Sequence, residues 1–356
     1  MAHDIYHLLR ERLDRYSHGF AATESGIEIK ILERFFTVEE AHMYLHLSDK
    51  LQSTVEIAEK SGLPIEKASD LLHQMTEKGL TFPKFSKKPD APCYFAAAPW
   101  SHGIWEHNAR FLDRGTSEMI LDYFRQGVFT RGPNPIRSIP VNSSIQANQK
   151  IAPFDNVKSI ILSKNLISVT PCACHDAHSA AGYRCDRDRE VCIWFDFYAE
   201  YYIAQKKARR ISADEAMALL IKTEKAGLVH QMANSLSPDS ICNCCPECCL
   251  GMKFLKKMRK PAKATVTNFQ ARIYSEMCSG CGTCMDRCPV NAVTVNRDAV
   301  AEINPDRCIG CGLCVSTCPE GALSLRQKPE EAYWIPPLSA PVMRPSKEIE
   351  DSITSG

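Results

Sequence analysis

The feature that most constrains this chain is a duplicated cysteine motif close to its C-terminal end. Both copies have the spacing C-x2-C-x2-C-x3-C-P, the first from Cys278 to Pro289 and the second from Cys308 to Pro319. The end of each copy and the residues after it also match. They read Cys-Pro-Val-Asn-Ala-Val-Thr-Val from Cys288 and Cys-Pro-Glu-Gly-Ala-Leu-Ser-Leu from Cys318. The repeat predicts two similar half-units related by a pseudo-two-fold axis. Three thiolates on one tight loop can reach three metal ions of one cluster, and a fourth ligand must come from elsewhere.

Glycines occupy equivalent places in both copies, at positions 280, 282, 310 and 312. Glycine permits sharp loop conformations and lets backbone N–H groups approach a buried cluster. The glycines are therefore consistent with loops that wrap closely around metal-bound sulfur.

The motif resembles that of bacterial two-cluster ferredoxin domains, in which the fourth cysteine of each run ligates the other cluster. The resemblance implies two [4Fe-4S] clusters. It assigns one cluster to Cys278, Cys281, Cys284 and Cys318, and the other to Cys308, Cys311, Cys314 and Cys288. Paired zinc sites are the alternative, but they would need neither the x3-C-P tail nor an exchange of ligands.

Composition narrows the class of protein. The chain has 356 residues, a net charge of +1 and 18 cysteines. Its first residues lack the apolar core of a signal peptide, and no apolar stretch approaches the ~18 residues of a membrane helix. We therefore expect two or three domains in a cytoplasmic protein without a membrane span, with reduced, metal-binding cysteines. Oxygen-sensitive thiol ligands suggest an anaerobic setting.

A second cysteine-rich region precedes the repeat. Its nine cysteines are Cys172, Cys174, Cys185, Cys192, Cys242, Cys244, Cys245, Cys248 and Cys249. Ordinary buried thiols would be strongly over-represented at this density. One or two further iron–sulfur clusters are the favoured interpretation, because the neighbouring repeat needs a redox partner within reach, and zinc is the alternative.

The simplest partition gives Cys172, Cys174, Cys185 and Cys192 one cube, and four of the five cysteines from 242 to 249 another. Adjacent cysteines cannot easily face one cube, because neighbouring side chains diverge. One or two of the five could therefore serve the other cluster, a non-cubane centre or redox thiol chemistry.

Three histidines lie close to this region in sequence: His175, His178 and His230. They are the candidate catalytic residues, since a histidine beside a metal centre can ligate iron, tune a cluster through a hydrogen bond or shuttle protons. A satisfied structural histidine is the alternative for each.

The N-terminal part is predicted to be helical. Apolar spacing predicts helices over 1–36, 38–51, 53–62 and 63–80, followed by a basic extended piece with Lys84, Lys87 and Lys88. The order resembles a winged helix-turn-helix. The helix predicted over 63–80 carries two basic residues, Lys67 and Lys78, and three acidic residues, Glu66, Asp70 and Glu77. That balance disfavours phosphate contact and favours a docking or structural role over DNA binding.

The predicted fold class is an α+β multidomain protein with a winged-helix-like domain, a central Cys-rich α/β metal-binding domain and a ferredoxin-like domain. The boundaries are 1–90 for the winged-helix-like domain, 91–150 for a helical arm, 151–251 for the Cys-rich domain, 252–267 for a basic linker, 268–326 for the ferredoxin-like domain and 327–356 for a Pro-rich tail. The linker could dock an acidic redox partner. The arm carries an apolar stripe from Ile104 to Phe124 that predicts core, and Ile193 to Lys207 is predicted to be helical.

The middle third also resembles Cys-rich segments of ferredoxin-like proteins of anaerobes, through Pro-Cys172-x-Cys174, Gly227-Leu-Val-His230 and Ile-Cys242-Asn-Cys244. The resemblance implies electron transfer between a donor and a partner oxidoreductase, as a carrier or subunit rather than a stand-alone enzyme. One alternative is a reductase or activator with a catalytic central cluster. Another is a redox-sensing DNA-binding regulator, and the helical N-terminus would allow a homodimer. No dinucleotide or P-loop fingerprint is present.

Overall fold

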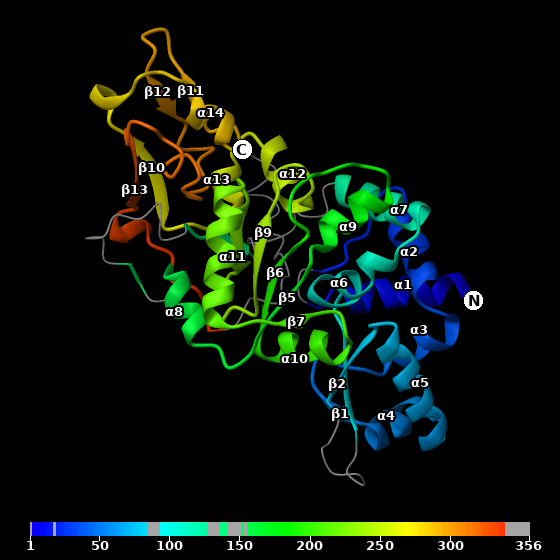
Figure 1. The fold of residues 1–356 in the computed structure, drawn as a ribbon. Helices are drawn as coiled ribbons and strands as arrows, with labels where there is room; N and C mark the ends of the chain where they lie inside the picture. The colour runs from blue at the N-terminus through cyan, green and yellow to red at the C-terminus, as the bar shows by residue number, and fades with distance from the viewer. Residues whose placement is uncertain are drawn as a thin grey trace. The chain divides into compact units, whose positions relative to one another are not determined.

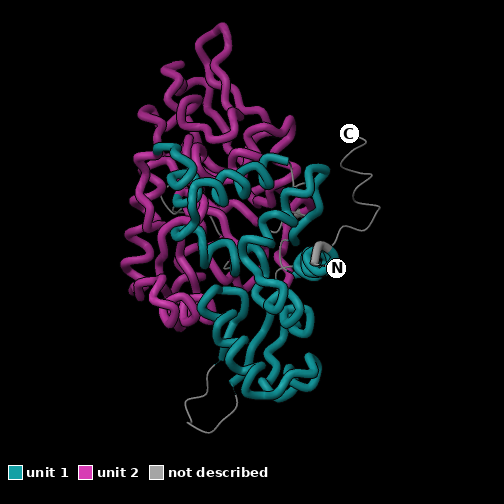
Figure 2. Tube along the Cα trace, turned by 90° about the vertical axis from the view of Figure 1, so that its right-hand side faces the viewer, with its two compact units in different colours: residues 1–132, 176–184, 342–356 teal, residues 133–175, 185–341 magenta. Residues whose placement is uncertain are grey.

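The computed structural model describes residues 2–16, 19–84, 93–126, 136–140, 151–152 and 155–338. The chain divides into two compact units (Figure 2): residues 1–132, 176–184 and 342–356 form the first, and residues 133–175 and 185–341 form the second. The second unit thus contains most of the Cys-rich region together with the duplicated motif. The predicted boundaries of the six segments stay a prediction, and the predicted basic residues Lys87 and Lys88 lie outside the described residues.

The first unit begins with helices around an aromatic core. The helices are α1 (Ala2–Leu13), α2 (Ile27–Phe35), α6 (Trp105–Asn108) and α7 (Arg114–Arg125), with a π-helical turn at Trp100–Ile104 and a 3-10 turn at Ala109–Phe111. Phe20 lies between Trp100 and Tyr123, with ring centroids 4.6 and 4.8 Å away. The apolar stripe of the arm supplies buried Trp105 and Ile120, so most of it is core.

A three-stranded sheet follows a run of short helices in the same unit. The elements are α3 (Val38–Leu45), β1 (Gln52–Ser53), α4 (Thr54–Ser61), α5 (Ile65–Glu77), β2 (Thr81–Lys84) and β3 (Tyr94–Ala97), and the strand order is β1-β3-β2. Thr37 and Ser53 begin α3 and α4 with reciprocal capping boxes. Gly62, with a φ of +69°, ends α4.

The second unit is built on a six-stranded sheet of order β4-β8-β9-β6-β5-β7 (Figure 1). Its strands are β4 (Ile136–Ser138), β5 (Ile167–Pro171), β6 (Glu190–Phe195), β7 (Arg209–Arg210), β8 (Val229–Ala233) and β9 (Ser240–Cys244). Neighbouring strands of this sheet pair antiparallel. Successive side chains therefore alternate between two faces, and each face has its own neighbours.

One face of this sheet is an apolar core. Helices α8 (Val157–Leu162) and α11 (Ala213–Lys225) cover it, and Ile193 of β6 and Ile241 of β9 pack there with Leu220 of α11. Because Ile193 pairs directly with Ile241, the residues next to them in sequence, Cys192 and Cys242, point to the opposite face. The sheet thus separates a hydrophobic core from a cysteine-bearing face.

One local prediction for this region is wrong in part. The prediction of a helix from Ile193 onward is wrong at its start, because Ile193 to Phe195 complete β6 and only α10 (Asp196–Ala204) is helical. The β-branched and aromatic residues of 191–195 suit the centre of a sheet. At the start of α11, the Ser212 side chain accepts a hydrogen bond from the N–H of Glu215 at 3.1 Å. The Glu215 carboxylate forms an ion pair with Arg209.

The duplicated motif folds into two small antiparallel pairs. Strand β10 (Phe269–Ile273) pairs with β13 (Leu323–Gln327), and β11 (Val293–Val295) pairs with β12 (Ala301–Ile303). Helix α14 (Thr283–Arg287) lies between β10 and β11 in sequence. The predicted basic linker is occupied by α12 (Leu250–Lys257) and α13 (Pro261–Ala264), which precede β10.

A buried ion pair joins the sheet to the motif and to the following segment. Arg137 of β4 contacts Asp155 at 2.7 Å, and both side chains are almost completely buried. Asn268 donates to the other Asp155 oxygen at 2.7 Å and also holds the backbone of Trp334. Hydrogen bonds to Asn268 therefore hold this part of the predicted tail against the second unit. No described helix is both long and apolar enough to span a membrane.

Candidate metal centres

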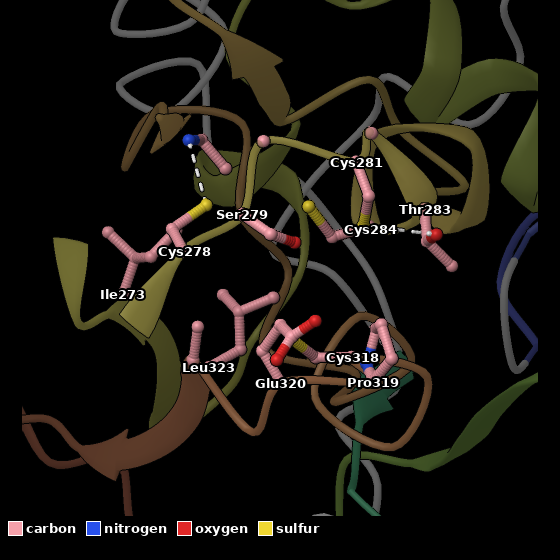
Figure 3. A pocket seen from close by; sticks show the side chains of 14 residues that line it. Ile273, Cys278, Ser279, Cys281, Thr283, Cys284, Cys318, Pro319, Glu320 and Leu323 are labelled. Atoms are coloured by element: carbon pink, nitrogen blue, oxygen red, sulfur yellow. Dashed lines mark hydrogen bonds between the residues drawn. The ribbon is translucent and has the colours of Figure 1, made fainter. Parts of the chain in front are cut away.

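A first cavity in the second unit, the outer cavity, is lined by Cys278, Cys281, Cys284 and Cys318. Figure 3 shows these cysteines above and below an opening that Ile273 and Leu323 also line. Three thiols come from the first copy of the motif and the fourth from the second. Cys281 is exposed while Cys284 is buried, so one side of the cavity opens to solvent.

A second cavity, the inner cavity, is lined by Cys288, Cys308, Cys311 and Cys314. Here the first copy supplies Cys288 and the second copy supplies the other three. The grouping is the one that an exchange of the fourth cysteine requires. Ligation of iron by these eight residues stays a prediction.

Two glycines explain how the loops close around the cavities. Gly280 has a φ of +68°, and a Cβ added there would lie 2.1 Å from the carbonyl oxygen of Ala299. Gly310 has a φ of +66°, and its added Cβ would lie 2.4 Å from the carbonyl oxygen of Phe269. Both positions need glycine for its left-handed backbone and for the close approach of another backbone segment.

Backbone N–H groups point at the sulfur atoms. The N–H of Ala292 donates to Cys288 Sγ at 3.1 Å, and the N–H of Ala301 donates to Cys278 Sγ at 3.4 Å. Such hydrogen bonds favour thiolate and are among the factors that set the potential of a bound cluster.

The inner thiols are poorly placed to ionise by themselves. Burial raises the pKa of Cys311, and burial together with neighbouring cysteines raises that of Cys314. A coordinated cation reverses this effect, because a metal-bound thiol is deprotonated. Four converging thiols with N–H donors in an enclosed cavity therefore fit a cationic iron–sulfur core.

Six central cysteines form a closed ring of thiol contacts, the six-thiol ring. In order around the ring, its members are Cys172, Cys174, Cys249, Cys244, Cys242 and Cys192, and each thiol is within hydrogen-bonding reach of the next. Cys192 closes the ring on Cys172. The ring is thus a single compact group of six sulfur donors.

Strand pairing builds one side of this ring. Cys242 and Cys244 are two residues apart on β9 and so share a face, and Cys192 lies on the neighbouring strand β6. Cys172 follows β5 directly, and its N–H donates to the carbonyl of Arg189 at 2.8 Å. The ring therefore depends on three adjacent strands of the sheet.

The other three central cysteines form a separate group. Cys185 Sγ lies 3.8 Å from Cys245 Sγ, and Cys248 is within hydrogen-bonding reach of both. Cys244 and Cys245 thus belong to different groups, as do Cys248 and Cys249. This division follows from the divergence of neighbouring side chains.

The sequence-based partition of these cysteines differs from the structure. Cys185 does not lie with Cys172, Cys174 and Cys192, and the five cysteines from 242 to 249 are split between the two groups. The physical reason is sheet register, which brings β9 beside β6 and places Cys242 near Cys192.

The three candidate histidines have different surroundings. His175 is buried within 4.8 Å of the Cys185 and Cys248 thiols, measured between possible ligand atoms. His178 belongs to the first unit, where its ring lies edge-on to Tyr183. His230 is buried on β8, and burial lowers its pKa to about 4, so it is neutral at pH 7.

Asn243 is a structural residue that the sequence analysis did not single out. Its Nδ2 donates to the carbonyl of Val191 at 2.6 Å, which leaves its Oδ1 to accept from Thr223 and from Nδ1 of His230. Asn243 thereby fixes the tautomer of His230 and ties β9 to α11 and β6. Its position between Cys242 and Cys244 is the sequence feature that could have pointed to this role.

The six-thiol ring borders the inner cavity. Cys244 and Cys249 of the ring pack in one hydrophobic cluster with Ile309 and Leu313, and Cys242, Cys288, Cys308 and Cys311 pack against the same cluster. Arg287 strengthens this junction by donating to the carbonyls of Glu224 and Lys225, each at 2.7 Å. Sulfur atoms of both kinds of site therefore share one apolar environment.

Comparison with known proteins identifies only the motif region. A curated relative from Methanosarcina thermophila, described as a probable ferredoxin, is 38% identical over 34 residues. These residues make up 10% of this chain and 59% of the relative, so the match spans less than two thirds of that protein. No solved structure matches the chain. Residues 271–325 match the family described as the 4Fe-4S dicluster domain, so this chain carries a ferredoxin-type iron–sulfur domain near its C-terminal end.

Proposed function

We propose that this chain is an electron-transfer protein in which the outer cavity, the inner cavity and the six-thiol ring hold three redox centres in series. Iron–sulfur clusters supply one-electron transfer when bound. The ferredoxin-type domain supports the first two centres. The third centre and the order of the three are the proposal.

The shared hydrophobic cluster is the observation that carries the proposal. It brings Cys308 and Cys311 of the inner cavity together with Cys244 of the ring. Apolar side chains around these sulfur atoms exclude water and keep the local dielectric low, which influences cluster potential. A ring that served only to stabilise the sheet would not need to border the ferredoxin-type domain.

Exposure gives the series a direction. Cys281 of the outer cavity is exposed, and the nearby apolar side chains of Met277 and Met285 are 48% and 43% exposed. In contrast, Cys244 and Cys249 of the ring are buried. We infer that a redox partner docks at the outer cavity and that the ring is the inner end of the series.

The ring differs in kind from the two cavities. Six thiols exceed the four that hold a cube, and neighbouring ring thiols are close enough to hydrogen-bond. A centre that fits this ring shares thiolates between metal ions, as a non-cubane iron–sulfur centre would. A zinc–thiolate centre in the ring is the alternative.

The first unit contributes a module for docking or support rather than for DNA. The order of α3, α4 and α5 with the β1-β3-β2 sheet supports our proposal that this module is winged-helix-like. The exposed side chains of α5 and its C-cap include Lys67 and Lys78, but also three acids: Glu66, Asp70 and Glu77. A net negative face is repelled by phosphates.

Metal and sulfide analysis of anaerobically purified protein tests the proposal. Two cubes alone give about eight irons per chain, and the proposed third centre raises this number. The double variant Cys242→Ser/Cys249→Ser should lose only the additional iron and one redox transition in an EPR-monitored potential titration. The matched control Cys93→Ser, which changes a partly buried cysteine of the first unit, should keep both. About eight irons in the wild-type protein, with zinc in the ring, would refute the third redox centre.

A further inference from the structure

Cys185, Cys245, Cys248 and His175 form a second metal-ligating group in the central region, outside the six-thiol ring. Possible ligand atoms of His175, Cys185 and Cys248 all lie within 4.8 Å of one another. Cys185 Sγ and Cys245 Sγ are 3.8 Å apart, and Cys248 is within hydrogen-bonding reach of Cys245. Possible ligand atoms of the other three side chains therefore all lie within 4.8 Å of Cys185 Sγ.

The 3.8 Å between Cys185 Sγ and Cys245 Sγ fits two ligands of a single ion. Sulfur ligands at about 2.3 Å from a tetrahedral zinc ion lie roughly 3.8 Å from each other. Thiolates on a four-iron cube bind different irons and lie farther apart. In the described residues of the outer and inner cavities, no hydrogen bond joins two cysteines, whereas Cys185 and Cys245 are in direct contact.

The local backbone around Cys245 also suits a zinc ligand. Cys245-Pro-Glu-Cys248 has the C-x2-C spacing common in structural zinc sites. The N–H of Glu247 donates to Cys245 Sγ at 3.4 Å. Such N–H donors orient a metal-bound thiolate.

The surroundings separate this group from the redox series. Cys245 and Cys248 pack with Val191 and Leu228, with Cys185 against them, in a cluster that contains no cysteine of either ferredoxin-type cavity. Cys172 of the six-thiol ring also borders this cluster. Three cysteines and one histidine are a ligand set typical of structural zinc.

We propose that Cys185, Cys245, Cys248 and His175 bind one zinc ion, distinct from the iron–sulfur centres. His175 and Cys185 flank residues 176–184, which belong to the first unit, while both flanking residues belong to the second. The ion thus joins the two ends of this segment and fixes the turn after β9. This inference does not depend on the redox role of the ring.

Zinc analysis of variants tests the proposal. The wild-type protein should contain about one zinc per chain in addition to its iron. Cys248→Ser and His175→Ala should each lose this zinc and keep the wild-type iron and sulfide content. His178→Ala, which changes a nearby histidine of the first unit, is the matched control and should keep the zinc.

A second measurement covers variants that fold poorly. Cobalt-substituted wild-type protein should show thiolate-to-cobalt charge-transfer absorption. His175→Cys should retain the cobalt with a shifted spectrum, since it supplies a fourth thiolate. Wild-type protein without zinc, His175→Ala with full zinc, or Cys248→Ser with less iron would each overturn the proposal.

Discussion

The ferredoxin-type domain and the central sheet gather thiols by different means. Each cavity of the domain takes three cysteines from one loop. The fourth cysteine, Cys318 or Cys288, comes four positions after the last cysteine of the other loop. The six-thiol ring instead takes cysteines from the end of β5, from β6 and β9, and from the starts of α9 (Ala173–Ala180) and α12. Loop-built sites depend on local backbone conformation, whereas the ring depends on strand register. The two should therefore fail in different ways when they are perturbed.

The largest expected effect separates a four-thiol site from a six-thiol site. Cys314→Ser removes one of the four cysteines of the inner cavity, so we expect a loss of about four irons per chain. Cys244→Ser leaves five thiols in the ring, so a smaller loss of metal is expected. Iron, zinc and sulfide analysis of the two purified variants provides the comparison. Equal losses would mean that the ring holds its metal no more redundantly than a cavity does.

The next prediction concerns the connection between the sheet and the domain. Arg137→Ala leaves Asp155 as an unpaired buried charge, which should lower the free energy of unfolding by about 3–5 kcal/mol. The control Lys260→Ala removes an ion pair with Asp306 in which both side chains are about half exposed, and should cost at most about 1 kcal/mol. Denaturant unfolding under anaerobic conditions measures both. Similar costs would show that the buried pair does not hold the two regions together.

A matched glycine pair tests the loop-built site itself. Gly280 and Gly282 both have positive φ, but only Gly280 has a carbonyl in the path of an added Cβ. Gly282→Ala should cost about 1–2 kcal/mol for its left-handed backbone. Gly280→Ala should add about 1–3 kcal/mol of overpacking and loosen the outer cavity. Thermal unfolding and retention of iron report the difference, and equal destabilisation would exclude the predicted clash with Ala299.

The sequence predicted the loop-built sites better than the ring for a physical reason. The spacing from Cys278 to Cys284 places three thiols on one loop, and the resemblance to two-cluster ferredoxins implies the fourth cysteine that lines each cavity. The contact between Cys192 and Cys242 depends on the pairing of β6 with β9, which no local spacing encodes. The divergence of Cys244 from Cys245 was foreseeable from backbone geometry. Their separate partners were not.

The last predicted effect is a pH dependence from the central sheet. His230 is buried against Asn243, and its pKa falls from an ordinary value near 6.5 to about 4. Because the unfolded chain binds this proton more tightly, the stabilising contribution is complete above about pH 6.5 and is lost as the pH falls toward 4. The total change is about 3 kcal/mol at most. His230→Gln should therefore flatten the unfolding free energy between pH 6.5 and 5 relative to wild type. Parallel pH profiles for the two proteins would contradict this prediction. They would show that His230 takes up no proton on unfolding, because the folded sheet already holds its charged form.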